Sequence, residues 1–204
     1  MKDFINVHQT YEKIIFADQR VNNREFDGCI FKNCDFSNSD FSANTFLDCE
    51  FYDCNLSNLF LRGTSLKQVH FENCKLLGVQ FQECDDFLFA VDFHSCNVDY
   101  ASFNNKKMHK AKFINSSLRE VNFTASDLTK AIFDDSNLQG AVFQNSILKE
   151  ANLYSAQNFS IDPEVNMLKK AIGGEFSLIT NAPKCVEISV SEQSAKSRYV
   201  VNML

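Results

Sequence analysis

The stretch CDFSNSDFSANTFLDCEFYDCNL, residues 34–56, places a large apolar residue at every fifth position. These residues are Phe36, Phe41, Phe46, Phe51 and Leu56. An α-helix repeats every 3.6 residues and a β-strand every two, so a period of five fits neither element. The period therefore belongs to a larger repeating unit, which we use to predict the fold.

The period of five extends far beyond this stretch. One series of fourteen apolar positions runs from Phe16 to Phe81, and a second runs from Leu88 to Leu153. We call each of these positions a centre, and the residue two before it, mostly Ala, Ser, Cys or Val, a slot. The step from Phe81 to Leu88 is seven, so the sequence predicts a two-residue register break at about residues 82–88.

A square coil satisfies this pattern, with five residues on each side. Centre and slot point inward, the other three positions face water, and coils of about twenty residues stack at roughly 4.8 Å, the spacing of β-strands. Twenty-eight repeats predict about seven coils. Residues twenty apart then stack in columns, and the predicted core columns are Phe31, Phe51 and Phe71; Phe93, Phe113 and Phe133; and Phe103, Phe123 and Phe143.

The motif A-[ND]-[LF]-x-x recurs as VNFTA (121–125), SDLTK (126–130), SNLQG (136–140) and ANLYS (151–155). In this the chain resembles the pentapeptide-repeat proteins, which implies an all-β solenoid, a right-handed quadrilateral β-helix. The stretches Thr64–Phe81 and Asn158–Asn166 resemble the members that protect bacterial type II topoisomerases, the Qnr, AlbG and McbG group. This resemblance implies a non-enzymatic partner of DNA gyrase or topoisomerase IV that counters quinolones or peptide toxins. It also implies a homodimer joined through the C-terminal segment.

The repeat boundaries divide the chain into four parts. We expect an N-terminal cap over residues 1–15, the β-helix over 16–158, a capping and dimerisation segment over 159–190, and a flexible tail over 191–204. The third part is predicted to begin with a short helix, because Asp162 suits a helix N-cap and Pro163 the first helical position. Gly173 and Gly174 would end this helix.

Seven of the eight cysteines fit the slot pattern: Cys29, Cys34, Cys49, Cys54, Cys74, Cys84 and Cys96. Free cysteine behaves as a small buried apolar residue, which favours a packing role. A metal site or a disulfide is the alternative, because the C-x4-C spacing occurs twice and Cys34, Cys54 and Cys74 share one predicted column. Zinc sites usually use closer pairs.

No catalytic signature stands out. Six scattered glycines form no phosphate-binding loop, and no H-E-x-x-H motif occurs. We therefore expect no enzyme activity and no cofactor or metal. The absence of an apolar run of about 18 residues argues against a membrane span. The N-terminus does not resemble a secretory signal, which favours the cytoplasm. A net charge of −6 disfavours nucleic acid as a direct partner.

Charge divides the repeat region into two halves. Residues 25–100 carry thirteen acidic and four basic residues, net −9, whereas residues 101–160 carry five acidic and seven basic residues, net +2. The acidic half has about one net charge per 2 Å, close to the roughly 1.7 Å of duplex DNA. This favours a rod that imitates DNA toward a basic groove. Two alternatives stay open: the acids serve solubility alone, or the rod is a passive protein-interaction scaffold. The candidate binding residues are Asp27, Asp35, Asp40, Asp48, Glu50, Asp53, Glu72, Glu83, Asp85 and Asp86.

The break itself is a second candidate contact. Phe87 and Phe89 flank the centre Leu88 in the inserted stretch Asp85–Phe89, and both are predicted to be exposed. Exposed aromatic residues often mark contact sites. The alternative is a register correction that packs its aromatic side chains against the surface.

Overall fold

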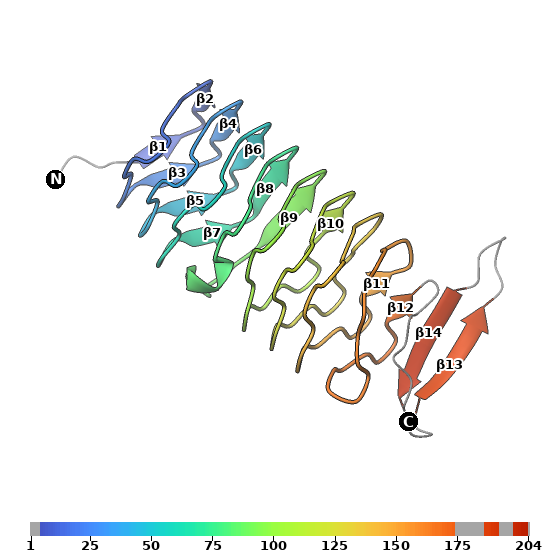
Figure 1. The fold of residues 1–204 in the computed structure, drawn as a ribbon. Helices are drawn as coiled ribbons and strands as arrows, with labels where there is room; N and C mark the ends of the chain where they lie inside the picture. Colours follow the sequence, from blue (N-terminus) through green and yellow to red (C-terminus); the bar gives the residue numbers. More distant parts are fainter. Residues whose placement is uncertain (1–4, 174–185, 192–197, 204) are drawn as a thin grey trace.

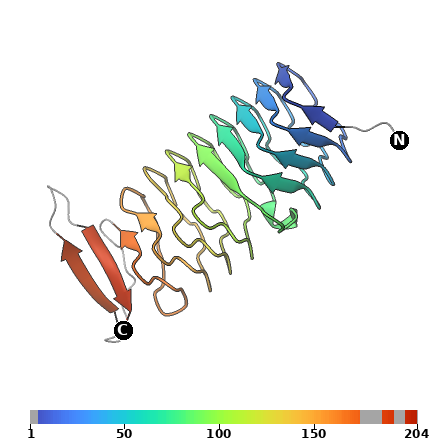
Figure 2. The same cartoon turned by 180° about the vertical axis from the view of Figure 1, so that it is seen from behind.

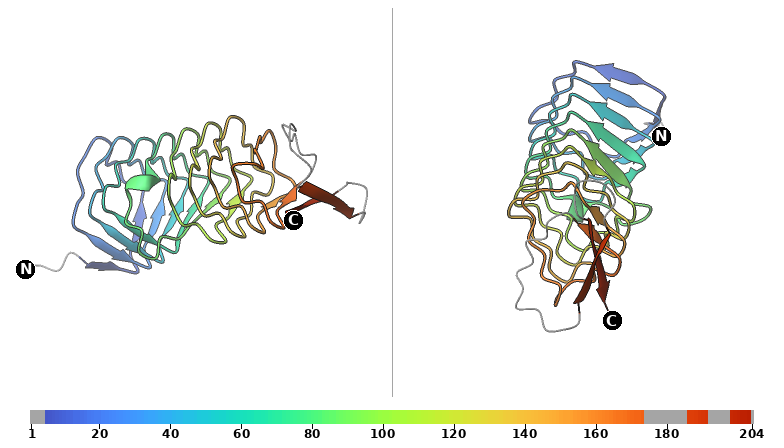
Figure 3. Two further views of the ribbon diagram at one scale, coloured as in Figure 1. Left: turned by 90° about the horizontal axis from the view of Figure 1, so that it is seen from below. Right: turned by 90° about the vertical axis from the view of Figure 1, so that its right-hand side faces the viewer.

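The computed structural model describes residues 5–173, 186–191 and 198–203. The chain winds into a rod of square coils that stack along one axis (Figure 1). Seen from behind, β1 and the β13–β14 pair lie at opposite ends of this rod (Figure 2). Views from below and along the rod show the successive coils superimposed on one another (Figure 3). The predicted quadrilateral β-helix is confirmed.

Two of the four sides contain short parallel strands. On face A the strands are β1 (Ile5–Val7), β3 (Glu25–Asp27), β5 (Thr45–Leu47) and β7 (Ser65–Lys67). On face B they are β2 (Thr10–Glu12), β4 (Ile30–Lys32), β6 (Glu50–Tyr52), β8 (Val69–Glu72), β9 (Val91–His94) and β10 (Phe113–Ile114). Beyond these strands, face A continues through paired Lys107, Asp127, Ile147 and Met167, and face B through Lys112, Ile132 and Asn152.

The other two sides are held by single parallel bridges. Face C runs through Ile15, Asp35, Asn55, Lys75, Asn97, Ser117, Asn137 and Gln157. Face D runs through Arg20, Asp40 and Phe60, and then through Gln80, Ser102, Asn122 and Val142. Each coil therefore visits faces A, B, C and D in that order.

The core consists of the centres, which stack in columns. Ring centroids are 4.6 Å apart for Phe31 and Phe51, and 5.5 Å apart for Phe103 and Phe123. The interplanar angles in these two pairs are 9° and 8°, so the rings lie nearly parallel. All nine phenylalanines expected in the core columns are buried. Such pairs add about 0.5–1.5 kcal/mol beyond the burial of their area.

Slot side chains connect each coil to the one before it. Ser126 Oγ donates a hydrogen bond of 2.7 Å to the carbonyl of Phe103, and Ser146 Oγ donates one of 2.8 Å to the carbonyl of Phe123. In both cases the acceptor is the centre 23 residues earlier. The slot must therefore be small, and a hydroxyl or thiol there satisfies a buried carbonyl.

Corners of the square require left-handed backbone at the second residue after each centre. Asp48 has φ of +51°, Asn58 of +55° and Gly78 of +68°. Asn, Asp and Gly tolerate this conformation best, because their side chains are short or absent. The corner therefore explains one of the polar positions in the five-residue pattern.

The solenoid is longer at both ends than the sequence predicted. The column on face B runs from Tyr11 to Gly173 in nine rungs, or about eight coils instead of seven. Residues 1–15 were expected to form a separate cap, but parallel pairing already begins at Ile5. The first coil thus belongs to the β-helix, because β1 and β2 extend the same two sheets.

The predicted helix after Asp162 is wrong, because the repeat continues there. Asn166 occupies a slot. Its Nδ2 donates a hydrogen bond of 2.8 Å to the carbonyl of Phe143, and its Oδ1 accepts one of 2.8 Å from the amide of Ser146. Leu168 is a buried centre. Pairing with the preceding coil therefore prevails over the local helix signals. The Asp-Pro pair lies in a turn instead, in which Asp162 Oδ1 accepts the amide of Glu164 at 2.8 Å.

A small mixed sheet follows the last coil. It contains β11 (Asn152–Leu153), β12 (Ile172–Gly173), β13 (Val186–Ser191) and β14 (Arg198–Met203), and β14 pairs antiparallel with β12 and β13. The tail over 191–204 was expected to be flexible, but residues 198–203 form β14. Residues 174–185 of the expected dimerisation segment lie outside the described residues.

The register break lies where it was predicted. Columns repeat every 20 residues before it, whereas Phe71 pairs with Phe93, 22 residues later. A 3-10 helix, η1 (Phe81–Glu83), precedes the inserted residues and projects beside β7 in Figure 1. The insertion thus interrupts face A and leaves faces B and C continuous, and on face D no bridge is present between Phe60 and Gln80.

The expected side-chain positions at the break need a correction. Leu88 was expected to be a buried centre, but it is 64% exposed and occupies a corner with φ of +59°. Phe89 was expected to be exposed, but only 8% of it is accessible, and its ring packs edge-on against Phe81 at 6.5 Å. The second extra residue shifts the inward position from Leu88 to Phe89. Phe87 is exposed, at 67%.

The seven cysteines in or beside the slots are buried and free. Burial raises the pKa of the Cys49 thiol to about 12, so this group is uncharged at neutral pH. Among the described residues, no three His, Cys, Asp or Glu side chains are grouped as a metal site would require. None of the described residues lies in a helix with the length and apolarity needed to cross a membrane.

Candidate partner-binding surface

The predicted acidic residues do not form one continuous surface. Face A and its corner carry Asp27, Asp48, Asp85 and Asp86; face B carries Glu50, Asp53 and Glu72; face C carries Asp35; and face D carries Asp40 and Glu83. The spread follows from the fold, because every fifth residue turns the chain onto the next side. A partner that contacts one side of the rod therefore meets only part of this set.

Two of the candidate acids are engaged in the structure of the coils. Asp35 Oδ1 accepts hydrogen bonds from Ser37, from its amide at 3.0 Å and its hydroxyl at 2.7 Å. Asp40 Oδ1 accepts the amide of Ser42 at 3.0 Å, and Oδ2 lies 3.2 Å from Arg20 Nε. These hydrogen bonds, from Ser37 and from Ser42, hold the pKa of Asp35 and of Asp40 below the ordinary value. Both carboxylates are half-buried and have structural partners.

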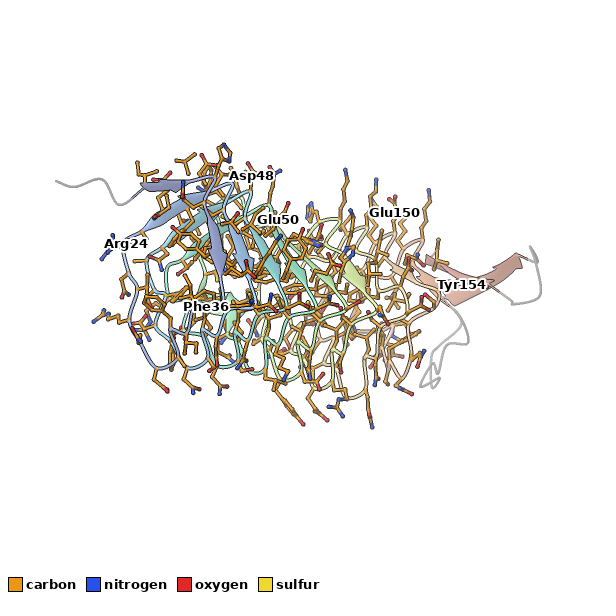
Figure 4. All side chains as sticks on the ribbon, turned by 90° about the horizontal axis from the view of Figure 1, so that it is seen from above. Arg24, Phe36, Asp48, Glu50, Glu150 and Tyr154 are labelled. Carbon is orange, nitrogen blue, oxygen red and sulfur yellow. The ribbon has the colours of Figure 1, made fainter. Side chains whose placement is uncertain are left out.

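The densest group of outward acids lies on face B and its corner. Glu50 begins β6, Asp53 follows that strand, and Glu72 ends β8 in the next coil. Asp48 lies at the corner before β6, and Figure 4 shows Asp48 and Glu50 close together on one side of the rod. We call Asp48, Glu50, Asp53 and Glu72 the face B cluster.

Aromatic and imidazole groups lie among these acids. Tyr52 donates its hydroxyl to Glu50 Oε2 at 2.6 Å, and this bond raises the pKa of Tyr52 to about 12. His70 pairs with Glu50 across the strands, and its Nε2 lies 3.7 Å from Glu72 Oε2. The His70 and His94 rings are 4.8 Å apart, and burial lowers the pKa of His94. Tyr52 and His70 therefore lie in contact with the carboxylates of the cluster.

A buried cation from the next coil contacts the inserted loop. Lys106 occupies a slot and is 2% exposed, where every neighbouring slot holds a small residue. Its Nζ lies 2.5 Å from Asp86 Oδ1 and 2.6 Å from the Cys84 carbonyl, and 5.2 Å from the centre of the Phe89 ring. Asp86 is thus a structural partner as well as a candidate contact residue. Asp85 Oδ1 accepts the amide of Phe87 at 3.1 Å, which fixes the start of the loop.

A second buried charge was missed entirely. The Asp99 side chain is fully buried and accepts from Arg119 Nε at 2.8 Å and from the Ser117 hydroxyl at 2.6 Å. Arg119 NH2 lies 2.6 Å from Asp99 Oδ2, and the pair raises the pKa of Arg119. The signal was available, because Asp99 and Arg119 are 20 residues apart and so belong to one column.

The register break also opens a surface hollow of about 270 Å³, although a filled solenoid was expected to offer no pocket. Its lining includes His70, Asp92, His109 and Lys110. His109 Nε2 lies 2.7 Å from Asp127 Oδ2, and Asp92 Oδ1 accepts the amide of Lys112 at 2.8 Å. No Ser or Cys lies among the described residues of its lining, so the hollow shows no nucleophile beside a base.

The sequence of the coils matches two family descriptions. "Pentapeptide repeat region" covers residues 24–103, and "Pentapeptide repeats (8 copies)" covers residues 88–124, 107–145 and 122–157. Together they span well over half of the chain. The protein belongs to the pentapeptide-repeat family.

Solved structures of the same family resemble the rod. Two trypsin-treated variants of QnrB1, a plasmid-mediated fluoroquinolone resistance protein, superpose with TM-scores of 0.54 and 0.56. Their sequences are 14% and 15% identical to this chain, and each match covers 81% of this chain and 92% of the other. HetL, a protein involved in heterocyst differentiation regulation from Nostoc sp. strain PCC 7120, has a TM-score of 0.46 at 15% identity, covering 84% of this chain and 92% of HetL. At these identities the likeness concerns the fold alone. No curated protein sequence is detectably similar to this chain.

Proposed function

We propose that this protein is a non-enzymatic binder of a DNA-binding protein, which it contacts through the acidic side chains of its N-terminal half. The proposed partner is a type II topoisomerase, DNA gyrase or topoisomerase IV, protected in this way from a quinolone or a peptide toxin. The rod competes with DNA for a basic groove and so assists release of the bound drug or toxin. The proposed site of action is the cytoplasm, and a C-terminal homodimer is part of the proposal.

The face B cluster is the observation that carries this proposal. Its four carboxylates lie on two successive coils and one corner, on a backbone held by parallel strands. A rigid surface loses little conformational entropy on binding, which favours recognition of a groove. Fixed negative charge also speeds association with a basic partner. The QnrB1 structures support the choice of partner class, because QnrB1 acts in fluoroquinolone resistance.

One observation favours a second function, a protein-interaction scaffold without a topoisomerase partner. The acids are distributed over four faces, and Asp35, Asp40 and Asp86 already have structural partners. A DNA-like charge array would instead place free carboxylates along one side. The two functions differ in one property, because a scaffold does not compete with DNA.

A supercoiling assay with purified gyrase separates the two functions. Micromolar protein is added with and without a quinolone, at low and at high salt. The proposed function predicts inhibition of supercoiling or protection from the drug, and both effects weaken as salt screens the charges. Absence of any effect, together with absence of gyrase binding in a pull-down, would leave the scaffold function.

A triple variant locates the contact. Glu50→Gln, Asp53→Asn and Glu72→Gln remove three charges from the face B cluster and keep side-chain size. We expect at least a tenfold loss of gyrase binding with an unchanged melting temperature. The matched control is Glu120→Gln, Asp135→Asn and Glu164→Gln, which removes the same charge from exposed positions in the C-terminal half. If both variants lose binding equally, net charge matters and the face B cluster is not the contact.

A further inference from the structure

Face A changes the sign of its charge halfway along the rod. In its first half, through the inserted loop, the outward positions hold five acids against Lys67, net −4: Glu25, Asp27, Asp48, Asp85 and Asp86. In the second half they hold six lysines against Asp127 and Glu150, net +4: Lys107, Lys110, Lys130, Lys149, Lys169 and Lys170. The two halves are equal and opposite.

Backbone bonds place these lysines close together. The amide of Lys110 donates to the carbonyl of Thr129, and the amide of Lys130 donates to that of Lys149, so their coils are adjacent. Glu150 lies 3.4 Å from Lys130 and 4.0 Å from Lys149, and so offsets positive charge at these two lysines. Within the described part of the chain, Lys107, Lys110, Lys169 and Lys170 form no ion pair. Figure 4 shows side chains that end in nitrogen on the side of the rod where Glu150 lies, the side that also holds Asp48.

An exposed apolar pair lies between the two halves. Phe87 and Leu88 are the exposed large apolar residues of the inserted loop, and Lys67 Nζ lies 5.3 Å from the centre of the Phe87 ring. This contact places Phe87 above Lys67 on the outward side of face A. Face A therefore has an apolar middle, an acidic end and a basic end.

We propose that face A binds face A of a second copy of this chain, with the two rods side by side and antiparallel. A two-fold axis through the loop at residues 85–88 sets the acidic half of each copy against the basic half of the other. Such an interface is self-complementary, as two-fold contacts require. The coil that holds Glu25 and Asp27 then lies opposite the coil that holds Lys149. Phe87 and Leu88 of both copies meet at the axis, which gives the apolar centre and polar rim of typical interfaces.

The size of the face sets the strength of this dimer. Eight coils at roughly 4.8 Å make a face about 38 Å long, and with a width of about 15 Å it covers about 570 Å² per copy. A standard interface buries about 800 Å² per partner, so we expect a weak dimer. Its charges face water before contact, and so the affinity falls steeply with salt. The contact shares Asp48 with the face B cluster, but the residues varied to test the two proposals differ, because Glu50, Asp53 and Glu72 lie on face B.

Two charge-reversed variants test the contact. Glu25→Lys with Asp27→Lys brings the first half of face A from net −4 to zero, and Lys149→Glu with Lys169→Glu brings the second half from net +4 to zero. Sedimentation velocity at about 20 mM salt and tens to hundreds of micromolar protein measures association. We expect the wild type to associate, each variant alone to lose this association at least tenfold, and an equimolar mixture of the two to regain it. Phe87→Ser should weaken wild-type association with an unchanged melting temperature.

The equimolar mixture of the two charge-reversed variants distinguishes the face A contact from a C-terminal dimer. A dimer through the C-terminal segment forms equally in both variants and in their mixture, and 300 mM salt leaves it largely intact. Equal association of the wild type, both variants and the mixture would therefore overturn the proposal. So would a wild type that shows no salt-sensitive association at the highest concentration.

Discussion

Lys106 Nζ lies 2.5 Å from Asp86 Oδ1, which joins a buried slot to the loop at the register break. Lys106 departs from the small-residue pattern of the slots, and Asp86 lies in the insertion. The long side chain in the slot and the insertion in the loop compensate each other structurally. The longer loop makes room for a long side chain, and the ammonium group gives a partner to the Cys84 carbonyl at 2.6 Å.

This pair predicts an asymmetric response to mutation. Asp86→Asn leaves a buried ammonium without its carboxylate and should lower the free energy of unfolding by about 1–3 kcal/mol. Lys106→Met keeps most of the side-chain volume and removes the charge, so its cost should be smaller. In the Lys106→Met background, Asp86→Asn should have almost no effect. Urea denaturation of the four proteins measures this cycle, and additive losses would show that the pair is not coupled.

The five-residue period predicts the coil, its inward columns and the position of the break, because each depends only on spacing. It does not predict which residue of the insertion points inward, since Leu88 and Phe89 are equally apolar and packing against Phe81 decides between them. The helix expected after Asp162 was wrong for a similar reason. Its local signals fit a helix, but Asn166 and Leu168 also fit slot and centre, and the preceding coil offers them partners.

The candidate surface was less predictable than the fold. Sequence charge located the acidic half, but it did not show that Asp35 and Asp40 bind turn amides at the coil corners. In these contacts the carboxylate accepts the amide two residues further along the chain, as in an Asx turn, just before the left-handed corner residue. The buried pair of Asp99 and Arg119 was detectable as opposite charges in one column, had the columns been searched for charge as well as for aromatic rings.

The Asp99 and Arg119 pair should be the most sensitive polar site of the rod. Asp99→Ala removes the carboxylate that accepts three hydrogen bonds. The donors are the Arg119 guanidinium, the Arg119 amide at 2.9 Å and the Ser117 hydroxyl. The Arg119 guanidinium is half exposed and can bind water when Asp99 is gone, so the loss comes mainly from the buried Ser117 hydroxyl and Arg119 amide that lose their acceptor, and we expect a lowered free energy of unfolding. Asp92→Ala is the comparison, because Asp92 is only partly buried, accepts a single amide, that of Lys112 at 2.8 Å, and has only a long contact of 4.0 Å with Lys112 Nζ. Equal losses in chemical denaturation would contradict the importance of burial.

The stacked rings predict a large cost at the middle of a column. Phe113 lies between Phe93 at 5.3 Å and Phe133 at 5.0 Å and is fully buried. Phe113→Ala should lower the free energy of unfolding by about 3–5 kcal/mol, because a cavity forms between two coils. Phe87→Ala, at an exposed position, should change it by about 0.5 kcal/mol or less. A similar melting temperature for the two variants would be inconsistent with a filled interior.

The carboxylates of Asp35 and Asp40 predict a loss of stability in acid. Hydrogen bonds from Ser37 and Ser42 lower their pKa values in the folded state. A lowered pKa means that the folded state favours the charged form, so the stabilisation is complete above the unfolded value of about 3.9. This stabilisation is lost as the pH falls from the unfolded pKa through the lower pKa of the folded state. The variant with Asp35→Asn and Asp40→Asn keeps acceptors for the turn amides but does not titrate there. We therefore expect it to be less stable than the wild type at pH 7 and to lose less stability between pH 5 and pH 2. Urea midpoints measured across this range test the prediction, and parallel curves for the two proteins would refute it.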